Sequence, residues 1–413
     1  MGAFSEFRDK KPKKRKNETP SVEEYYISLA RKTAVLRYAC LILIVLLIVY
    51  SLSFRNDVIT IDNFRYMLKF IDIKGDADAP KGTALSFDGS SGSKGLLYKG
   101  DLAVINDSGL TVAGWDGNIL LRSSFSYDHP IIAENGINLF CCDMGSKEVR
   151  IYNSYSLIST VTFDYPVLDL AVSQSGGFAV VGSSKGYRSA VFIYDKEFRL
   201  VFTRNVGDKY VDFADISANG KSFITAAHYS SDGQLTTLVS RFDTDVSDEP
   251  LETKEFIGEM PLGIYYTEGG YALLTDSALR RFDNDGNEIS AVSFSGKKLL
   301  SGSLYGERSL ICYAKEGLSG GTVACVYNSD GSLAATREYP SALNAAVING
   351  DRLYAVYPGR LCIADIAGGG NEVYSVPTSF CDIIPDGSNI ILFSNNEADY
   401  FIPENFDKAE DTQ

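Results

Sequence analysis

The sequence predicts an all-β fold, a β-propeller of eight blades with seven as the alternative, behind an N-terminal single transmembrane helix. Three observations lead to this prediction. The composition of 25 Tyr, 23 Phe and 37 Gly beside only 4 Met favours strands and tight turns over helices. A turn signal recurs about every 41 residues, and one long apolar run lies near the N-terminus.

Residues 38–54 form the only long apolar run of the sequence, with Arg37 before it and Arg55 after it. Together with the four residues before Arg37, the run is long enough to cross a bilayer as a helix. Residues 1–37 carry a net charge of +5, and the rest of the chain carries −19. The apolar run leads us to expect a plasma-membrane protein, and its basic flank is expected to stay in the cytoplasm. Residues 1–37 would be a cytoplasmic basic tail, residues 38–54 would contact the lipid bilayer, and the remainder would lie outside.

Two other interpretations of the N-terminal region remain open. The run could be a cleaved signal peptide, with Ser51–Ser53 as a loose cleavage site, although a signal peptide has a much shorter basic start. The basic run Lys10–Lys16 could be a nuclear-localisation or RNA-binding patch. The net charge of −14 argues against a nucleic-acid partner, so a topology signal that touches anionic lipid is the preferred interpretation.

The segment 55–82 is predicted to hold a juxtamembrane helix and a linker. Apolar residues between Ile61 and Ile71 fall on one helical face, and residues 73–82 are rich in Gly, Asp, Ala and Pro. Residues 83–406 are predicted to form the propeller, and residues 407–413 an acidic C-terminal tail.

A turn glycine recurs eight times after residue 83. These glycines are Gly100, Gly136, Gly176, Gly220, Gly270, Gly306, Gly350 and Gly387. Their mean spacing of about 41 residues is typical of propeller blades with four strands each. Residues 167–206 show all four strands of one blade, VLDLAVS, GFAVVGS, SAVFIYD and LVFTRNV, whereas the last unit, from Phe380, shows three. We therefore expect the strand near Thr83–Phe87 to complete the last unit and close the ring.

These features together resemble a family of membrane-anchored bacterial propeller proteins that is catalogued as a domain of unknown function. The resemblance covers most of the chain, and its most specific stretch is Val172–Asp195, VSQSGGFAVVGSSKGYRSAVFIYD. It implies topology and fold but no activity, so it assigns no functional residue. The blades are also loosely similar to WD-repeat and quinoprotein-type propellers. The Gly-His and Trp-Asp pairs of WD repeats are absent, however, apart from Trp115-Asp116.

The sequence offers no motif that predicts catalysis, a metal or a cofactor. Two G-x-S-x-G matches begin at Gly182 and Gly317, but neither is followed by the helix of a nucleophile elbow. The acidic turn Asp283–Gly286 lacks the spacing of a calcium loop and is better explained as a hairpin turn. Cys312 and Cys325 could face each other across a hairpin, although free buried thiols are favoured.

The longer loops are predicted on one face of the ring, and they carry aromatic and basic residues of the kind that bind partners. The candidate binding residues are Tyr165, Tyr187, Tyr210, His129, His228 and Arg360. Packing of these side chains between blades is the equally weighted alternative.

The leading hypothesis is a non-enzymatic, membrane-tethered extracytoplasmic β-propeller that binds or scaffolds an envelope protein or glycan. The alternative is an enzyme that acts on a glycan or peptide in the central depression of the propeller, which would need convergent carboxylates. Candidates for that role are Asp169, Asp212, Asp215 and Asp382. A third hypothesis is a transmembrane sensor whose short tail, residues 1–37, could act only by recruitment.

Overall fold

The computed structural model describes residues 33, 35–47, 85–89, 92–244, 249–267, 269–317, 320–368 and 370–409. The chain divides into two compact units, residues 1–69 and 70–413. In the first unit, residues 35–47 are helical. Within the described ranges, no helix is both long enough and apolar enough to span a bilayer. The end of the predicted span, residues 48–54, the predicted juxtamembrane segment 55–82 and most of the basic tail lie outside the described residues.

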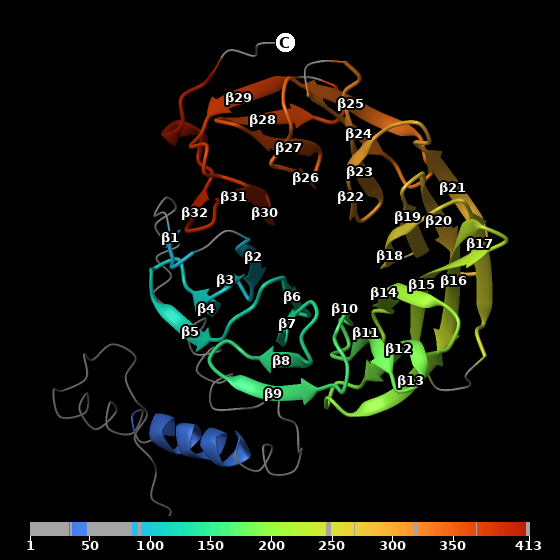
Figure 1. Cartoon of the computed structure of the whole chain (residues 1–413). Coiled ribbons are helices and arrows are strands. Elements are labelled where there is room, and N and C mark those ends of the chain that lie inside the picture. The colour runs from blue at the N-terminus through green and yellow to red at the C-terminus, as the bar shows by residue number, and fades with distance from the viewer. Residues whose placement is uncertain are drawn as a thin grey trace, which may run out of the picture. The chain divides into compact units, whose positions relative to one another are not determined.

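The second unit is a β-propeller with eight blades, each an antiparallel sheet of four strands (Figure 1). Blade 1 contains β2 (Lys94–Tyr98), β3 (Asp101–Asn106), β4 (Gly109–Ala113) and β5 (Ile119–Ser124). Blade 2 contains β6 (Pro130–Glu134), β7 (Leu139–Asp143), β8 (Glu148–Tyr152) and β9 (Leu157–Thr162). Blade 3 contains β10 (Asp169–Val172), β11 (Phe178–Ser184), β12 (Tyr187–Tyr194) and β13 (Leu200–Val206). Blade 4 contains β14 (Tyr210–Ile216), β15 (Ser222–Ser231), β16 (Gln234–Asp243) and β17 (Glu252–Ile257).

The second half of the ring follows the same order. Blade 5 contains β18 (Pro261–Thr267), β19 (Gly270–Thr275), β20 (Ala278–Asp283) and β21 (Glu288–Ser293). Blade 6 contains β22 (Leu299–Tyr305), β23 (Arg308–Ala314), β24 (Thr322–Tyr327) and β25 (Leu333–Tyr339). Blade 7 contains β26 (Ala345–Asn349), β27 (Arg352–Tyr357), β28 (Arg360–Asp365) and β29 (Asn371–Ser375). Blade 8 contains β30 (Asp382–Asp386), β31 (Asn389–Phe393), β32 (Glu397–Tyr400) and β1 (Leu85–Ser86), and the short 3-10 helix η1 (Pro403–Asn405) follows β32.

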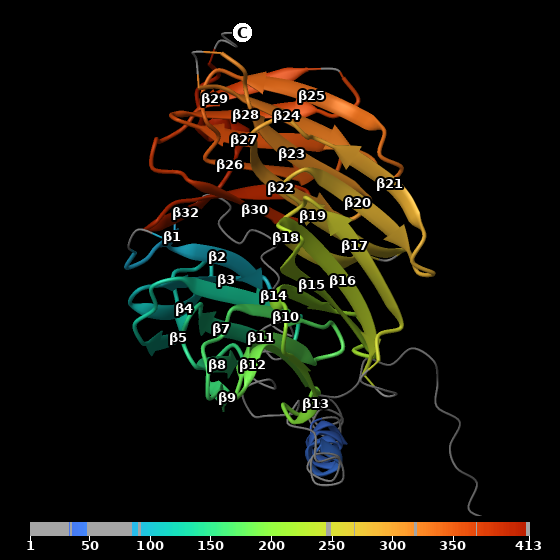
Figure 2. The ribbon, with the colours of Figure 1, turned by 45° about the vertical axis from the view of Figure 1, so that its right-hand side comes forward.

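The hydrophobic core lies between neighbouring blades. Figures 1 and 2 show the first strand of each blade nearest the ring axis and the last at the periphery. The second strand has a neighbouring blade on each face, so β3 and β19 are buried at every position. The outer strand β9 instead alternates between exposed and half-buried residues. The contact between blades 2 and 3 is typical: the ring centroids of Phe140 and Phe178 are 5.3 Å apart, and Phe178 stacks on Tyr194 at 4.6 Å.

The eight predicted turn glycines mark the same turn in every blade, the one between the first and second strands. All eight have positive φ angles, between 55° and 148°. Glycine adopts this region without the steric cost that a Cβ atom would bring, which explains why the repeat is visible in the sequence. The predicted count of eight blades is confirmed by the sheet order.

The ring closes as predicted, by pairing the start of the propeller with its last strand. In the register of β1 and β32, Leu85 is opposite Ala398 and Ser86 is opposite Glu397. The Phe87 amide donates to the Asn396 carbonyl at 3.0 Å, and the Phe87 ring stacks on Phe393 at 5.5 Å. A strand of two residues therefore closes the last blade, with an aromatic contact beside it.

The chain continues along the propeller past the predicted boundary at residue 406. The Ser375 amide donates to the Asp407 carbonyl at 2.9 Å, and the Ala409 amide donates to the Val373 carbonyl at 2.8 Å. Residues 407–409, predicted as part of an acidic tail, thus line the outer edge of β29, while residues 410–413 lie outside the described residues.

Cys312 and Cys325 do not face each other. Cys312 pairs with Ala324, and Cys325 pairs with Ile311, so the two cysteines are one register position apart on neighbouring strands. Their side chains consequently point to opposite faces of blade 6 and enter different core clusters. Both thiols are free and buried.

Candidate functional site

The connections of the propeller form two opposite faces. We call one face the loop rim: it holds the turn between the second and third strands of each blade and the connection from one blade to the next. The other turns form the turn rim. All six predicted binding residues lie at the loop rim: His129 and Tyr165 before β6 and β10, Tyr187, Tyr210 and Arg360 at the starts of β12, β14 and β28, and His228 near the end of β15.

Two of the six residues, Tyr210 and His228, contact each other where blade 3 meets blade 4, and Tyr187 precedes Arg188 of the same region. Tyr210 and His228 are opposite each other in the β14–β15 register, and their rings stack with centroids 5.4 Å apart. The Arg188 guanidinium lies 5.1 Å from the centre of the Tyr210 ring, within the range of a cation–π contact. Tyr187, the residue before Arg188, is 46% exposed, and Tyr210 is 47% exposed. Tyr187, Arg188, Tyr210, Asp212 and His228 are called the Tyr210 cluster below.

Asp212 anchors this cluster from a β-bulge. The register of β14 and β15 shifts between Val211 and Phe213, which leaves Asp212 without a partner residue in the ladder. Its carboxylate instead contacts the His228 ring, with Asp212 Oδ2 at 2.6 Å from His228 Nδ1. Burial raises the pKa of the Asp212 carboxyl, and the contacts with His228 act in the opposite direction. The pair holds the imidazole in place beneath the exposed tyrosine ring.

The other three predicted residues lie apart from the cluster. His129 is in the connection between blades 1 and 2, where its backbone amide donates to Asp143 Oδ1 at 2.5 Å. Tyr165 is in the connection between blades 2 and 3 and is 36% exposed. Arg360 begins β28 in blade 7, on the far side of the ring from β12 and β14 (Figure 1). One rim therefore holds all six residues, but only Tyr210 and His228 are in contact, with Tyr187 next in the chain to Arg188.

Arg188 was not among the predicted residues, although it follows a predicted tyrosine in the sequence. Its guanidinium contacts Tyr210 of the next blade and donates to the Asp208 carbonyl at 3.4 Å. The signal available in the sequence was a basic residue beside an aromatic one in a loop. Nothing in the sequence indicated that Arg188 and Tyr210, on different blades, would be neighbours.

Two of the four carboxylates proposed for an enzyme join adjacent blades. Asp169 Oδ2 accepts a hydrogen bond from the Ala214 amide at 3.1 Å, and Asp215 Oδ2 accepts one from the Tyr266 amide at 2.7 Å. Each bond links the first strand of one blade to the first strand of the next. Burial raises the pKa of Asp215 to about 6 and also raises the pKa of Asp169. Asp382 lies in blade 8 and accepts a hydrogen bond from the Ile383 amide at 2.8 Å.

The acidic turn at Asp283–Gly286 is a hairpin turn, as predicted. Asp283 Oδ1 accepts a hydrogen bond from the Asn287 amide at 2.7 Å, and the Gly286 amide donates to the Asp283 carbonyl at 3.0 Å. The carboxylate therefore caps its own turn. Across the described part of the chain, no group of three or more His, Cys, Asp or Glu side chains is arranged to hold a metal ion.

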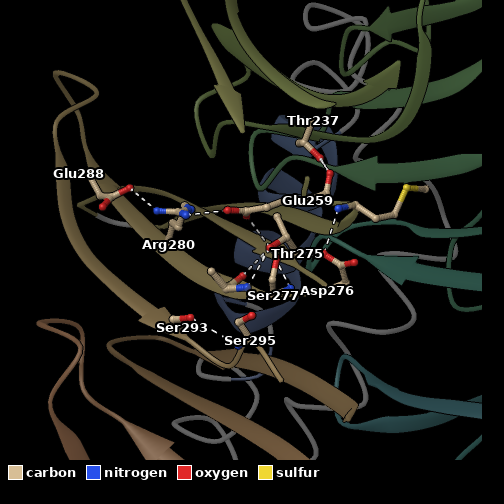
Figure 3. Close-up of polar contacts among 11 residues, drawn as sticks. Thr237, Glu259, Thr275, Asp276, Ser277, Arg280, Glu288, Ser293 and Ser295 are labelled. Carbon is tan, nitrogen blue, oxygen red and sulfur yellow. Dashed lines mark hydrogen bonds and ion pairs between the residues drawn. The ribbon is translucent and has the colours of Figure 1, made fainter. Parts of the chain in front are cut away.

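A second polar cluster lies at the loop rim where blade 4 meets blade 5 (Figure 3). Its two threonines are buried, Glu259 and Arg280 are half-buried, and Glu288 is exposed. Glu259 Oε1 pairs with Arg280 Nη2 at 2.7 Å, and Glu259 Oε2 accepts from Thr275 Oγ1 at 2.8 Å. Arg280 Nη1 also contacts Glu288 Oε2 at 3.0 Å, and Thr237 Oγ1 donates to the Glu259 carbonyl at 2.6 Å. We call these five residues the Glu259 network. These hydrogen bonds and ion pairs join blade 4 to blade 5.

Comparisons with known proteins agree with this architecture. A family model described as a family of unknown function, DUF5711, matches residues 82–400. A search of curated protein sequences found no significant match. Among solved structures, the chain is similar to Saccharomyces cerevisiae Sqt1, with 10% identity and a TM-score of 0.57 over 78% of this chain and 99% of that chain. The C-terminal WD40 domain of Sif2 has 12% identity and a TM-score of 0.55, over 78% and 99% of the two chains. BamB from Moraxella catarrhalis has 12% identity and a TM-score of 0.51, over 78% and 97%. These similarities show the propeller fold.

Proposed function

We propose that this chain, which belongs to the family of unknown function DUF5711, is a non-enzymatic β-propeller that binds or scaffolds an envelope partner outside the cytoplasm while tethered to the plasma membrane. The observation that carries the binding proposal is the Tyr210 cluster. It presents two tyrosines, each nearly half exposed, on a rigid base of strands. Tyrosine and arginine are the residue types that most often dominate the energy of protein interfaces.

The environment of the cluster favours a partner with both apolar and polar groups. The Tyr210 ring has His228 stacked against it and Arg188 nearby, so the site combines aromatic surface with a cation and an imidazole. Nearby, Lys209 pairs with Asp208 Oδ2 at 2.6 Å and lies 5.2 Å from the centre of the Tyr229 ring. An envelope protein segment with exposed acidic and aromatic residues would match this chemistry, and so would the sugar face of a glycan.

The proposal of a non-enzymatic role is supported by what the central carboxylates do. Asp169 and Asp215 accept hydrogen bonds from backbone amides of the neighbouring blade. Asp212 contacts His228 in the Tyr210 cluster. Three of the four carboxylates considered for catalysis therefore have a partner on another strand.

The proposal of a membrane tether is supported by the charge distribution and the apolar run. The net charge changes from +5 before the run to −19 after residue 37, and residues 35–47 are helical. A basic tail beside an apolar run favours a tail in the cytoplasm and an acidic propeller outside.

Crosslinking in intact membranes followed by pull-down tests the partner surface. In the Tyr187→Ala/Tyr210→Ala variant, we expect capture of the crosslinked partner to fall about 30-fold or more, since one hot-spot residue contributes about 2 kcal/mol. The control is Leu200→Ala/Leu333→Ala, which removes two exposed apolar side chains beside the turn rim. An unchanged yield of crosslinked partner from the tyrosine variant, together with a sharply lower melting temperature, would show that the tyrosines serve blade packing.

Protease added to intact cells tests the topology separately. We expect cleavage of the propeller or of the segment before it, with residues 1–37 protected. Cleavage of residues 83–413 only after lysis would contradict an extracytoplasmic propeller.

A further inference from the structure

A basic pocket lies at the loop rim where blade 5 meets blade 6. Its volume is about 380 Å³, which is within the range of small-ligand sites. Lys297 and Lys298 line it from the connection before β22, and Lys315 lines it from the end of β23. Tyr313, Ala314 and Val323 supply apolar surface, and Glu316 is the one acidic residue of the lining. Three lysines thus line one pocket in a chain whose net charge is −14.

The backbone around the lysines is fixed by hydrogen bonds. The Ala314 amide donates to the Lys298 carbonyl at 2.9 Å, and the Lys297 amide donates to the Phe294 carbonyl at 3.0 Å. The Lys315 amide donates to the Gly321 carbonyl at 2.8 Å. The positions from which the three side chains extend are therefore set before any ligand arrives, which lowers the entropic cost of binding.

The three lysines differ in their contacts. Lys315 Nζ pairs with Glu338 Oε2 at 2.7 Å. The Lys297 ammonium lies 4.8 Å from the centre of the buried Tyr313 ring. Among the residues that the structure describes, no carboxylate forms an ion pair with Lys297 or Lys298. Neighbouring lysines repel one another unless an anion lies between them.

We infer that this pocket binds the phosphate group of a small soluble ligand, with the apolar part of the ligand against Ala314 and Val323. A phosphate monoester carries between one and two negative charges at neutral pH, and lysine is a common binder of phosphate. The pocket is separate from the Tyr210 cluster, so the inference does not depend on the partner proposed for that surface.

Isothermal titration calorimetry on the full chain in detergent tests the inference with three probes that share a benzene ring. Phenyl phosphate, benzoate and benzyl alcohol differ in the polar group alone, and the ionic strength is matched. We expect saturable binding of one phenyl phosphate, binding of benzoate about tenfold weaker or more, and no heat of binding from benzyl alcohol. Equal affinity for phenyl phosphate and benzoate would overturn the assignment to phosphate. Equal affinity for benzyl alcohol would overturn an anion site altogether.

Matched variants locate the site. Lys297→Gln/Lys298→Gln should weaken phenyl phosphate binding about tenfold or more. The control Lys196→Gln/Lys221→Gln removes the same charge from exposed positions on the turn rim and should leave the affinity unchanged. If both variants weaken binding equally, the attraction is a general charge effect and the pocket is not the site. Should the double variant fold poorly, Lys298→Gln alone decides, since its ammonium makes no hydrogen bond or ion pair with another described side chain.

Discussion

The Tyr210 cluster and the Glu259 network occupy equivalent positions on the loop rim, one blade apart, and their polar side chains have different surroundings. Both carboxylate oxygens of Glu259 have partners, and its side chain is only 13% exposed. Tyr210 stacks on His228 yet remains 47% exposed. The difference shows that the region where two blades meet at the loop rim can either hold the blades together or present side chains to a partner. Burial and completeness of the hydrogen bonds distinguish the two cases.

The largest expected effect on stability comes from the Glu259 network. Glu259→Ala should lower the free energy of unfolding by about 3 kcal/mol, because it leaves Arg280 and Thr275 without their shared partner in a partly buried site. Urea unfolding of the full chain measures the change. The control Glu338→Ala, which breaks the more exposed pair with Lys315, should cost less than about 1 kcal/mol. Similar losses in the two variants would mean that the network is not a special link between blades.

A smaller effect is expected from the ion pair at the base of the Tyr210 cluster. His228→Phe keeps a ring against Tyr210 but removes the partner of Asp212, and should cost about 1 kcal/mol of stability at pH 7. Burial already raises the pKa of Asp212, and the loss of His228 should raise it further. When the pKa of a carboxyl is higher in the folded state than in the unfolded state, the protonated carboxyl stabilises the fold at a pH below the unfolded-state pKa. This stabilisation is lost as the pH rises through the folded-state pKa.

The stability of the His228→Phe variant should therefore fall more steeply between pH 4 and pH 7 than that of the unsubstituted protein. Urea unfolding at both pH values measures this difference. His129→Phe, which changes the other histidine of the sequence, should show no such additional slope. A cost for His228→Phe that is the same at pH 4 and pH 7 would show that ionisation of Asp212 is not involved.

The smallest expected effect on stability comes from Arg188 in the Tyr210 cluster. Arg188→Gln removes the cation beside the Tyr210 ring and should change the free energy of unfolding by only about 0.5 kcal/mol. Partner capture in the crosslinking assay should nevertheless fall about fivefold or more, because arginine is enriched among interface hot spots. A loss of stability as large as that of Glu259→Ala, with capture retained, would place Arg188 among the residues that hold blades together.

The repeat in the sequence was sufficient to predict the ring. Each blade needs a glycine with positive φ at the turn between its first two strands, so Gly136, Gly220 and their equivalents recur at the period of the blade. Closure by the segment near Leu85 was predictable for a related reason, since the last unit lacked one strand and an open edge is unfavourable. The predicted loop rim likewise followed from strand order. Turn residues and strand order determine these features, and both can be read directly from the sequence.

Only the tertiary structure decided which residues of that rim meet. Arg188 and Tyr210 are brought together by the contact of blade 3 with blade 4, whereas Arg360 lies across the ring despite its similar position in its own blade. Glu259 and Arg280 look like ordinary surface charges in the sequence, and only packing shows that they are half-buried partners. Likewise, nothing in the sequence showed that Lys315 would share a pocket with Lys297, or that residues 407–409 would pair with β29. Contacts between blades depend on the angle and register at which separate sheets pack, and these quantities are fixed only when the whole ring assembles.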